Sequence, residues 1–140
     1  MVNDQFRVRI AGLDDLAVIR HHELPREKIA QKINQGEIVL LLDRDQLIGS
    51  LWMGYLWDCV PFIDLIIIDA AYRKLGLSHI LLGFVEEHFR EQGYTLLYSS
   101  SQLDEPAGQT WHRHMGFEEC GMINGLNQGG IGEVFFRKTL

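Results

Sequence analysis

The stretch from Ile66 to Leu82, IIIDAAYRKLGLSHILL, decides the predicted fold. It begins with β-forming residues that end at Asp69, continues through a basic segment that contains Gly76, and then takes the apolar spacing of an amphipathic helix. The first N–H groups of a helix lack intrahelical partners and attract anions. The segment from Arg73 to Ser78 is therefore a candidate site for a phosphate-bearing ligand.

The pattern of this loop excludes two common phosphate sites. It lacks the GxxxxGK[ST] of a Walker loop and has only one of the glycines of the dinucleotide fingerprint. It resembles the pyrophosphate-binding loop of the GNAT superfamily, the acetyl-CoA-dependent N-acyltransferases, whose pattern is [QR]-x-x-G-x-[GA]. Arg73, Gly76 and Ser78 occupy its three fixed positions, and Ser78 is a small residue in place of glycine or alanine.

A second segment downstream carries the same resemblance. The family usually has N-x-x-A-x-x-[FL]-Y-x-x-x-G-F here, and this chain has EPAGQTWHRHMGF from Glu105 to Phe117. The final Gly-Phe matches, and Trp111 fills the bulky apolar position. Three positions depart from the pattern: Glu105 replaces Asn, Gly108 replaces Ala and His112 replaces Tyr.

Periodicity and turn residues predict eleven elements along the chain. We expect strands over residues 6–10, 38–42, 46–57, 61–69, 94–100, 118–124 and 133–138, and helices over 13–20, 25–36, 77–92 and 104–115. The order resembles the GNAT fold: an α/β (α+β) class with a mixed central sheet of about six or seven strands and about four flanking helices. No linker or repeat is visible, so residues 1–140 are predicted to form a single GNAT-like domain.

The resemblance also implies a cofactor and its contacts. The cofactor would be acetyl-CoA, with its pyrophosphate on the loop formed by Arg73, Lys74, Leu75, Gly76, Leu77 and Ser78. In the family the central strands splay apart, and backbone groups exposed there bind pantetheine; the corresponding residues here are Ile66, Ile67 and Ile68. Trp111 would also contact the cofactor.

Asp64 is the candidate residue for the amine acceptor. It is the one acidic residue inside the apolar strand predicted over 61–69, which ends at Asp69, and it lies on the face shared with Phe62 and Ile66. The GNAT family often places a catalytic base on this strand. Asp64 could deprotonate the acceptor, directly or through water, or only bind its ammonium group. A structural carboxylate held by Arg or by backbone N–H groups is the other interpretation.

His112 stands where the family usually has a tyrosine close to the sulfur of CoA. A histidine with an ordinary pKa of about 6.5 is roughly a quarter protonated at pH 7, and proton transfer to a thiolate of pKa about 8.5 is downhill. His112 is therefore the candidate general acid. The alternative is a half-exposed histidine with a packing role.

An aromatic segment precedes the strand that carries Asp64. Trp52, Tyr55, Trp57 and Asp58 are candidate acceptor-binding residues, since alternate positions of a strand face opposite sides. Aromatic core packing is the other interpretation of the same residues.

Composition narrows the class of protein. The 140 residues have a net charge of −6 and no block of Lys or Arg, which argues against nucleic acid as a partner. No apolar run reaches transmembrane length, so neither a membrane nor an export signal is expected, and we predict a cytoplasmic protein. The two cysteines and six histidines lack the spacing of metal ligands, so no metal is predicted, and a homodimer is left open.

The resulting hypothesis is an acetyl-CoA-dependent N-acetyltransferase that acts on a primary amine by direct attack in a ternary complex. A small amine, an amino acid and a peptide or protein amine are all open as acceptors, and so is an acyl group longer than acetyl. The altered Tyr, Asn and Ala positions keep open a non-catalytic acyl-CoA-binding or regulatory module on the same fold. A protein-interaction partner without CoA binding is disfavoured because Arg73 and Gly76 are intact.

Overall fold

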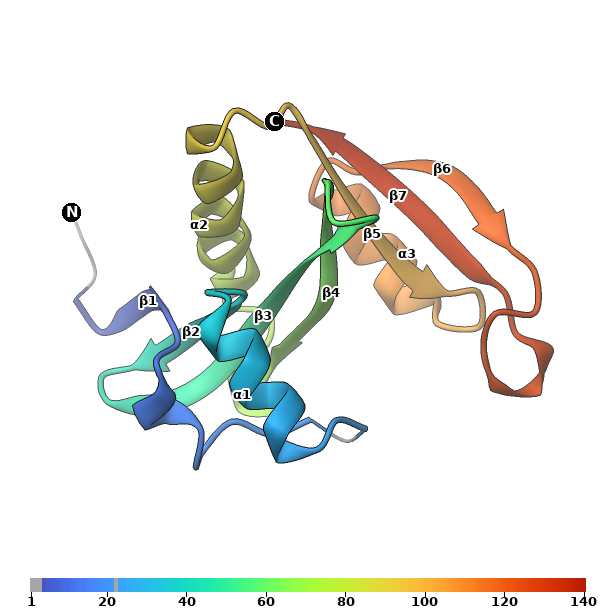
Figure 1. Ribbon diagram of the computed structural model, residues 1–140. Coiled ribbons are helices and arrows are strands. Elements are labelled where there is room, and N and C mark those ends of the chain that lie inside the picture. Colours follow the sequence, from blue (N-terminus) through green and yellow to red (C-terminus); the bar gives the residue numbers. More distant parts are fainter. Residues whose placement is uncertain (1–3, 22) are drawn as a thin grey trace. The chain divides into compact units, whose positions relative to one another are not determined.

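The computed structural model describes residues 4–21 and 23–140 (Figure 1). The strands are β1 Phe6–Ile10, β2 Ile38–Asp43, β3 Gln46–Leu56, β4 Val60–Ile68, β5 Leu96–Gln102, β6 Glu118–Ile123 and β7 Glu133–Thr139. The α-helices are α1 Arg26–Asn34, α2 Leu77–Glu91 and α3 Pro106–His114. Short 3-10 helices lie at Leu13–Asp15, Ala70–Tyr72 and Gln128–Gly130.

Strand pairing gives a seven-stranded sheet in the order β1-β2-β3-β4-β5-β7-β6. The sheet is mixed: the β1–β2, β2–β3, β5–β7 and β6–β7 pairs are antiparallel, whereas β4 and β5 are parallel. The register of β4 with β5 consists of one pair among the described residues, Phe62 with Tyr98. These features confirm the predicted fold class.

The helix predicted over residues 13–20 is wrong, so the described chain has three α-helices instead of four. Only Leu13–Asp15 is helical, as a 3-10 turn. The Asp15 carboxylate accepts the N–H of Gly12 at 2.8 Å and both terminal nitrogens of Arg9 at 2.8 Å. A side chain that bonds the neighbouring backbone in this way competes with helix propagation.

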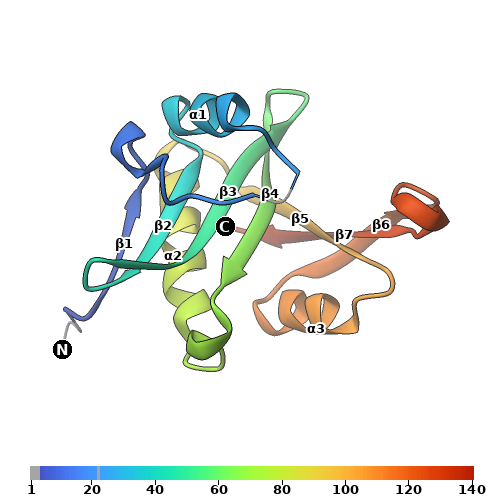
Figure 2. The ribbon, with the colours of Figure 1, turned by 90° about the horizontal axis from the view of Figure 1, so that it is seen from below.

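The described chain divides into two compact units. The first contains the described residues up to Met53 together with Leu65–Val85. Within it, α1 lies alongside β2 and β3 in both ribbon views (Figures 1 and 2). Ile29 and Ile33, one helical turn apart, pack with Ile38, Leu40 and Trp52, and these five side chains are at most 5% exposed. This cluster is the core of the first unit.

The second unit contains Gly54–Asp64 and Glu86–Leu140. Its centre is the β5–β7–β6 group of strands, with α3 packed beside β5 and β6 (Figure 1). Phe136 of β7 is fully buried, as is Leu97 of β5, while all residues of β6 are exposed. The core of this unit therefore lies between α3 and the strands β5 and β7.

Candidate functional site

The segment after β4 forms a tight basic loop in the first unit. The 3-10 turn at Ala70–Tyr72 ends in extended backbone at Arg73, where ψ is 158°. Lys74 and Gly76 then have φ angles of +64° and +77°. Glycine adopts such left-handed angles without cost, whereas they are uncommon for a residue such as lysine. The predicted loop therefore bends at Lys74 and Gly76, and these two bends lead its backbone into the first turn of α2.

The side chains of this loop point to solvent except at its end. Arg73, Lys74, Leu75 and Gly76 are exposed, while Leu77, the first residue of α2, is 3% exposed and anchors the helix. The Arg73 Nε donates to the carbonyl oxygen of Ile68 at 3.0 Å. This bond holds the guanidinium near the end of β4 through Nε alone, and the side chain is otherwise exposed. The loop thus offers two cations and a helix N-terminus, as an anion requires.

The end of β4 runs unusually close to β3. A β-carbon added at Gly49 of β3 would lie 2.8 Å from the carbonyl oxygen of Ile67. Only glycine fits against a backbone at that distance. Ile67 itself is 39% exposed, and Ile66 and Ile68 are half-buried, so the three residues predicted to bind pantetheine lie at a partly open stretch of strand.

Asp64 lies in the second unit and is exposed. Its carboxylate sits over Gly54 of β3, where an added β-carbon would lie 2.6 Å from Oδ1 and 2.7 Å from Oδ2. Asp64 is therefore a solvent-exposed position in a strand whose other residues are mostly apolar. The missing side chain of Gly54 makes room for the carboxylate on the surface of the strand pair.

The aromatic residues of β3 have different environments. Trp52 is 1% exposed in the core of the first unit, and its Nε1 donates to the Ser50 hydroxyl at 3.1 Å. This burial fits the core-packing interpretation of Trp52. Tyr55 is half-buried in the second unit, with its ring edge-on to Phe89 at 5.8 Å between centroids.

Trp57 and Asp58 form the turn between β3 and β4. The N–H of Cys59 donates to the carbonyl of Leu56 at 3.0 Å, and both central residues have positive φ, +52° and +59°. This is the backbone twist that connects hairpin strands tightly, here without the usual glycine or asparagine. Trp57 is 84% exposed as a result. The second unit thus carries three predicted acceptor residues, Tyr55, Trp57 and Asp58, on the hairpin that also carries Asp64.

His112 is buried in α3, only 4% exposed, and both of its ring nitrogens are bonded. Nδ1 lies 2.7 Å from the carbonyl oxygen of Gly108, and Nε2 lies 2.7 Å from the Ser99 hydroxyl. A carbonyl only accepts, so Nδ1 carries the proton and Nε2 accepts from Ser99 when the ring is neutral. The ring also stacks on Phe136, with centroids 4.5 Å apart and an interplanar angle of 5°.

The surroundings of His112 favour its neutral form. Burial lowers the pKa of His112 below its ordinary value, while the hydrogen bond to Gly108 and the charge of Glu133 act in the opposite direction. Trp111 beside it is half-buried and stacks on Phe117 at 6.3 Å. The alternative interpretation of His112 as a half-exposed histidine is therefore wrong, because the ring is a core side chain of the second unit.

A polar network beside His112 was not predicted. The Ser100 hydroxyl donates to Glu133 Oε2 at 2.6 Å, and the Asn127 amide donates to Glu133 Oε1 at 2.9 Å. Glu133 thereby holds the loop between β6 and β7 to β5. The only signal in the sequence was a polar Asn within a Gly-rich segment, which does not specify a partner 6 residues away or one on another strand.

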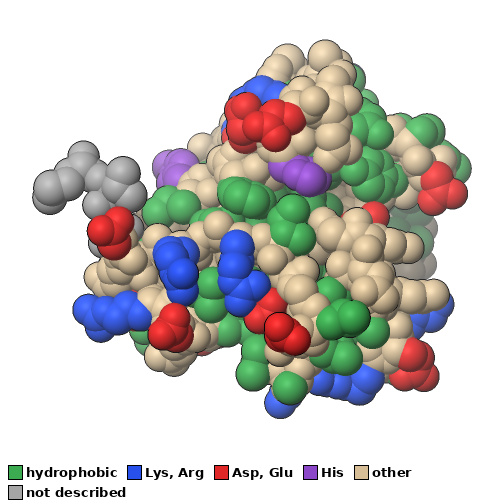
Figure 3. Space-filling view, turned by 60° about the vertical axis from the view of Figure 1, so that its left-hand side comes forward, with side chains coloured by type: hydrophobic (Ala, Val, Ile, Leu, Met, Phe, Trp, Pro, Cys, Tyr) green, Lys and Arg blue, Asp and Glu red, His purple; other side chains and the backbone are tan. Residues whose placement is uncertain are grey.

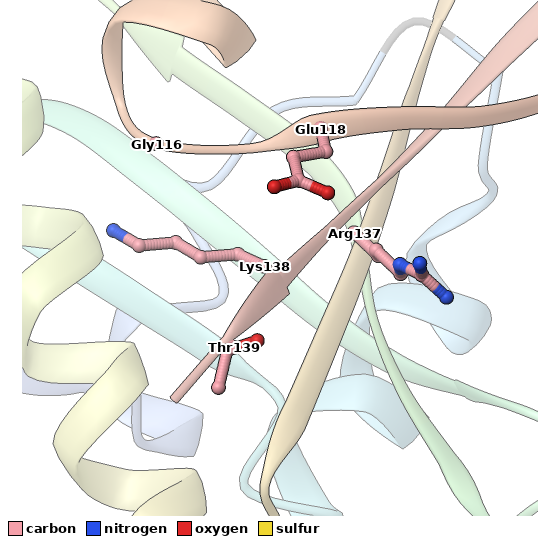
Figure 4. A pocket seen from close by; sticks show the side chains of 5 residues that line it. All are labelled: Gly116, Glu118, Arg137, Lys138 and Thr139. Carbon is pink, nitrogen blue, oxygen red and sulfur yellow. The ribbon is translucent and has the colours of Figure 1, made fainter.

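A shallow pocket lies at the β6–β7 pair of the second unit (Figure 4). Gly116, Glu118, Arg137, Lys138 and Thr139 line it, and none of them is a predicted site residue. Arg137 and Lys138 leave β7 on opposite sides in Figure 4. The Lys138 ammonium pairs with Glu86 at 2.6 Å, so the charge of this lysine is already compensated. We assign no role in the chemistry to this pocket.

Comparison with known proteins identifies the family. The profile described as "Acetyltransferase (GNAT) family" matches residues 7–117, most of the chain. This chain belongs to the GNAT acetyltransferase family, as the loop and the Gly-Phe segment predicted. No curated protein sequence matches it significantly.

Solved structures share the fold over almost the whole chain. A GNAT-family acetyltransferase from Bacillus cereus is 25% identical, with a TM-score of 0.80 and 96% of both chains covered. A Bacillus anthracis protein described as a "putative streptothricin acetyltransferase", in complex with acetyl coenzyme A, is 16% identical. Its TM-score is 0.82, and 96% of this chain and 98% of that chain are covered. The ribosomal-protein-S18-alanine N-acetyltransferase from Escherichia coli is 18% identical, with a TM-score of 0.77 and coverage of 96% and 93%.

Charged side chains of both signs are interspersed with apolar ones on the face shown in Figure 3. Among the described residues, no helix has the length and apolar character needed to cross a membrane. In the same part of the chain, no group of three or more His, Cys, Asp or Glu side chains is arranged to hold a metal ion.

Proposed function

We propose that this chain is an acetyl-CoA-dependent N-acetyltransferase that acts on a primary amine by direct attack in a ternary complex. The observation that carries the proposal is the loop from Arg73 to Ser78, with its two left-handed residues, two cations and helix N-terminus, in a chain of the GNAT family. The family profile spans residues of both units, which supports treating residues 1–140 as one functional domain. A cytoplasmic location remains part of the same proposal.

The donor site would be the loop and the end of β4. Arg73, Lys74, Leu75, Gly76, Leu77 and Ser78 hold the pyrophosphate, and the backbone of Ile66, Ile67 and Ile68 holds pantetheine. Trp111 contributes a further cofactor contact. The bound acetyl coenzyme A in the B. anthracis structure, which has the same fold, supports acetyl-CoA as the donor.

The acceptor must lose a proton before it attacks. An amine of pKa about 10.4 is deprotonated in roughly one molecule per few thousand at pH 7, so a group that binds or deprotonates the ammonium is useful. Asp64 would do this work, with Tyr55, Trp57 and Asp58 on the same hairpin as acceptor contacts. The E. coli protein of this fold acts on an alanine of a ribosomal protein, which supports an amine as acceptor.

The chemical step is a substitution at the thioester carbonyl. The amine nitrogen bonds to the carbonyl carbon, the C–S bond breaks, and the leaving thiolate takes a proton while the nitrogen loses one. We propose His112 as the source of the thiolate's proton. Only its cation has a proton to give without breaking the Gly108 bond, and burial keeps this cation scarce at neutral pH.

The scarcity of the His112 cation at neutral pH favours a second candidate function, a non-catalytic acyl-CoA-binding module. A ring with both nitrogens bonded to Ser99 and Gly108 suits packing as well as catalysis. The two candidates differ in one measurable respect, since only an enzyme releases CoA thiol when an amine is present.

The test combines binding and turnover. Calorimetry measures CoA binding to the wild type and to Gly76→Val, in which the +77° φ angle is strained although the space around Gly76 is open. Thiol release is then followed with acetyl-CoA and a panel of small amines, amino acids and peptides. Unchanged CoA affinity in folded Gly76→Val would contradict the donor site. CoA binding without thiol release across the panel would favour the binding module.

A further inference from the structure

The donor loop is tied to a strand hairpin far away in the sequence. The Tyr72 hydroxyl, one residue before Arg73, donates to Asp43 Oδ2 at 2.5 Å. Asp43 ends β2, and its other oxygen accepts from the Gln5 amide at 3.2 Å. The Phe6 ring stands edge-on to the Tyr72 ring, with centroids 6.3 Å apart and an interplanar angle of 88°. All four residues belong to the first unit.

The bond between Tyr72 and Asp43 has the character of a charge-assisted hydrogen bond. It lowers the pKa of the Asp43 carboxyl and raises the pKa of the Tyr72 hydroxyl, so a neutral phenol donates to an ionised carboxylate at neutral pH. Such bonds contribute more than neutral ones to holding a geometry.

Tyr72 connects the segment after β4 to a distant part of the chain through a side-chain hydrogen bond. The start of the segment is held by the N–H of Asp69, which donates to the Ile48 carbonyl at 2.8 Å. Among the described residues, its next side-chain hydrogen bond to a distant part of the chain is that of the Tyr72 hydroxyl, immediately before Arg73. The four residues that follow, up to Gly76, are exposed. The orientation from which Arg73 and Lys74 extend thus depends on where Tyr72 is held.

We propose that Tyr72 and Asp43 are positioning residues for the donor, which set the Arg73–Ser78 loop in the conformation that receives pyrophosphate. A loop that is ordered before binding loses less conformational entropy when the ligand arrives. The inference rests on the proposed function, because it concerns the same donor site. Neither residue belongs to the family pattern by which the loop was found.

The test compares two donors that share the acetyl-pantetheine portion. Acetyl-CoA adds the pyrophosphate and the phosphorylated adenosine beyond it, whereas S-acetyl-pantetheine lacks both. Tyr72→Phe removes only the hydroxyl, and Asp43→Asn removes only the charge. We expect either change to raise the KM for acetyl-CoA and the Kd for CoA roughly tenfold, as for the loss of one charge-assisted bond. We expect kcat and the KM for S-acetyl-pantetheine to stay within about twofold of the wild type.

The double variant and two matched controls complete the design. Because the residues act through one bond, Tyr72→Phe with Asp43→Asn together should weaken CoA binding no more than either change alone. Tyr94→Phe removes a hydroxyl elsewhere, and Asp45→Asn removes an exposed charge beside the same turn; both should bind CoA as the wild type does.

Three results would overturn the inference. Equal losses with both donors would show that the substitutions merely destabilise the chain, and an unchanged Kd for CoA would show that the bond does not position the loop. If Gly76→Val loses CoA while Tyr72→Phe does not, the donor site stands and only the positioning role fails. A wild type that does not bind CoA at all would overturn both.

Discussion

The carboxylate of Asp64 occupies the space that a side chain at Gly54 would need. An added β-carbon at Gly54 would lie 2.9 Å from the carboxylate carbon of Asp64 and closer still to both oxygens. Glycine on β3 and aspartate on β4 therefore form a pair in which one residue makes room for the other. If Asp64 handles the acceptor, Gly54 determines where its carboxylate lies.

Substitution of Gly54 by Ala should displace the Asp64 carboxylate without unfolding the chain, because the atoms that must move are the end of an exposed side chain. We expect kcat/KM for the amine to fall about 10–100-fold, as for a misplaced catalytic group, with CoA affinity unchanged. Gly121→Ala is the control, since an added β-carbon there meets nothing within 4 Å. Equal kinetics for the two variants would mean that the position of the carboxylate is irrelevant.

Replacement of Asp64 by Asn keeps the shape and removes the charge. If Asp64 is a general base, kcat/KM for the amine should fall by ~10²–10⁴-fold while the Kd for CoA stays the same. Steady-state kinetics between pH 6 and 9 and calorimetry with CoA measure the two quantities. Full activity across that range would make Asp64 a structural carboxylate.

The stability of the chain should depend on pH through His112. The pKa of the folded His112 lies below its ordinary value, so the unfolded chain takes up a proton first as the pH falls. Its contribution is fully present above about pH 6.5 and is lost as the pH falls toward the folded pKa. His112→Phe should also leave the Ser99 and Gly108 groups without partners, at a cost of roughly 1–3 kcal/mol at pH 7.5.

Urea unfolding at pH 7.5 and pH 5 checks this dependence. The difference in unfolding free energy between wild type and His112→Phe should be larger at pH 7.5 than at pH 5. If the difference in unfolding free energy between wild type and His112→Phe is the same at both pH values, the environment of the ring does not favour its neutral form.

The activity profile tests the catalytic role of the same ring. If the His112 cation is the proton donor, kcat/KM should fall as the pH rises through its lowered pKa, and deprotonation of the acceptor pulls the other way, so the profile is bell-shaped. His112→Tyr should retain activity and move the alkaline limb upward, because tyrosine titrates near ~10. A His112→Phe enzyme with the wild-type profile would leave the ring a packing role only.

The ion pair of Asp15 with Arg9 should stabilise the first unit in a defined pH range. The hydrogen bond from Arg9 lowers the pKa of Asp15 to about 2. The carboxylate therefore contributes stability above about pH 4, the ordinary aspartate pKa, and this contribution is lost as the pH falls toward 2. Asp15→Asn should lower the melting temperature at pH 6 but not at pH 2. Asp45→Asn is the control, because Asp45 pairs with Arg7 while fully exposed and should change little at either pH.

Much of this fold was predictable because its signals are local. The β1 strand was predicted from alternation alone, and α2 from an apolar stripe that follows a glycine. The loop from Arg73 to Ser78 was predictable for the same reason, since its charges and its glycine are adjacent in the sequence.

What escaped prediction depends on distant partners. Trp52 lies on β3 and Trp57 in the turn that follows it. Although both are tryptophans, Trp52 is buried in the core and Trp57 is exposed. The partner of His112 is Ser99, 13 residues earlier, and Tyr72 meets Asp43 across 29 residues. Periodicity assigns a side chain to a face, but only tertiary packing decides what covers that face.

The exposed indole of Trp57 gives this protein a built-in optical reporter. Trp52 is shielded at 1% exposure, whereas Trp57 is 84% exposed at the tip of the β3–β4 turn. A soluble quencher such as iodide should therefore reach Trp57 most readily, the half-buried Trp111 less, and leave Trp52 untouched. Protection from that quencher, followed while amines are titrated, would report on acceptor binding at the hairpin without any label and without turnover.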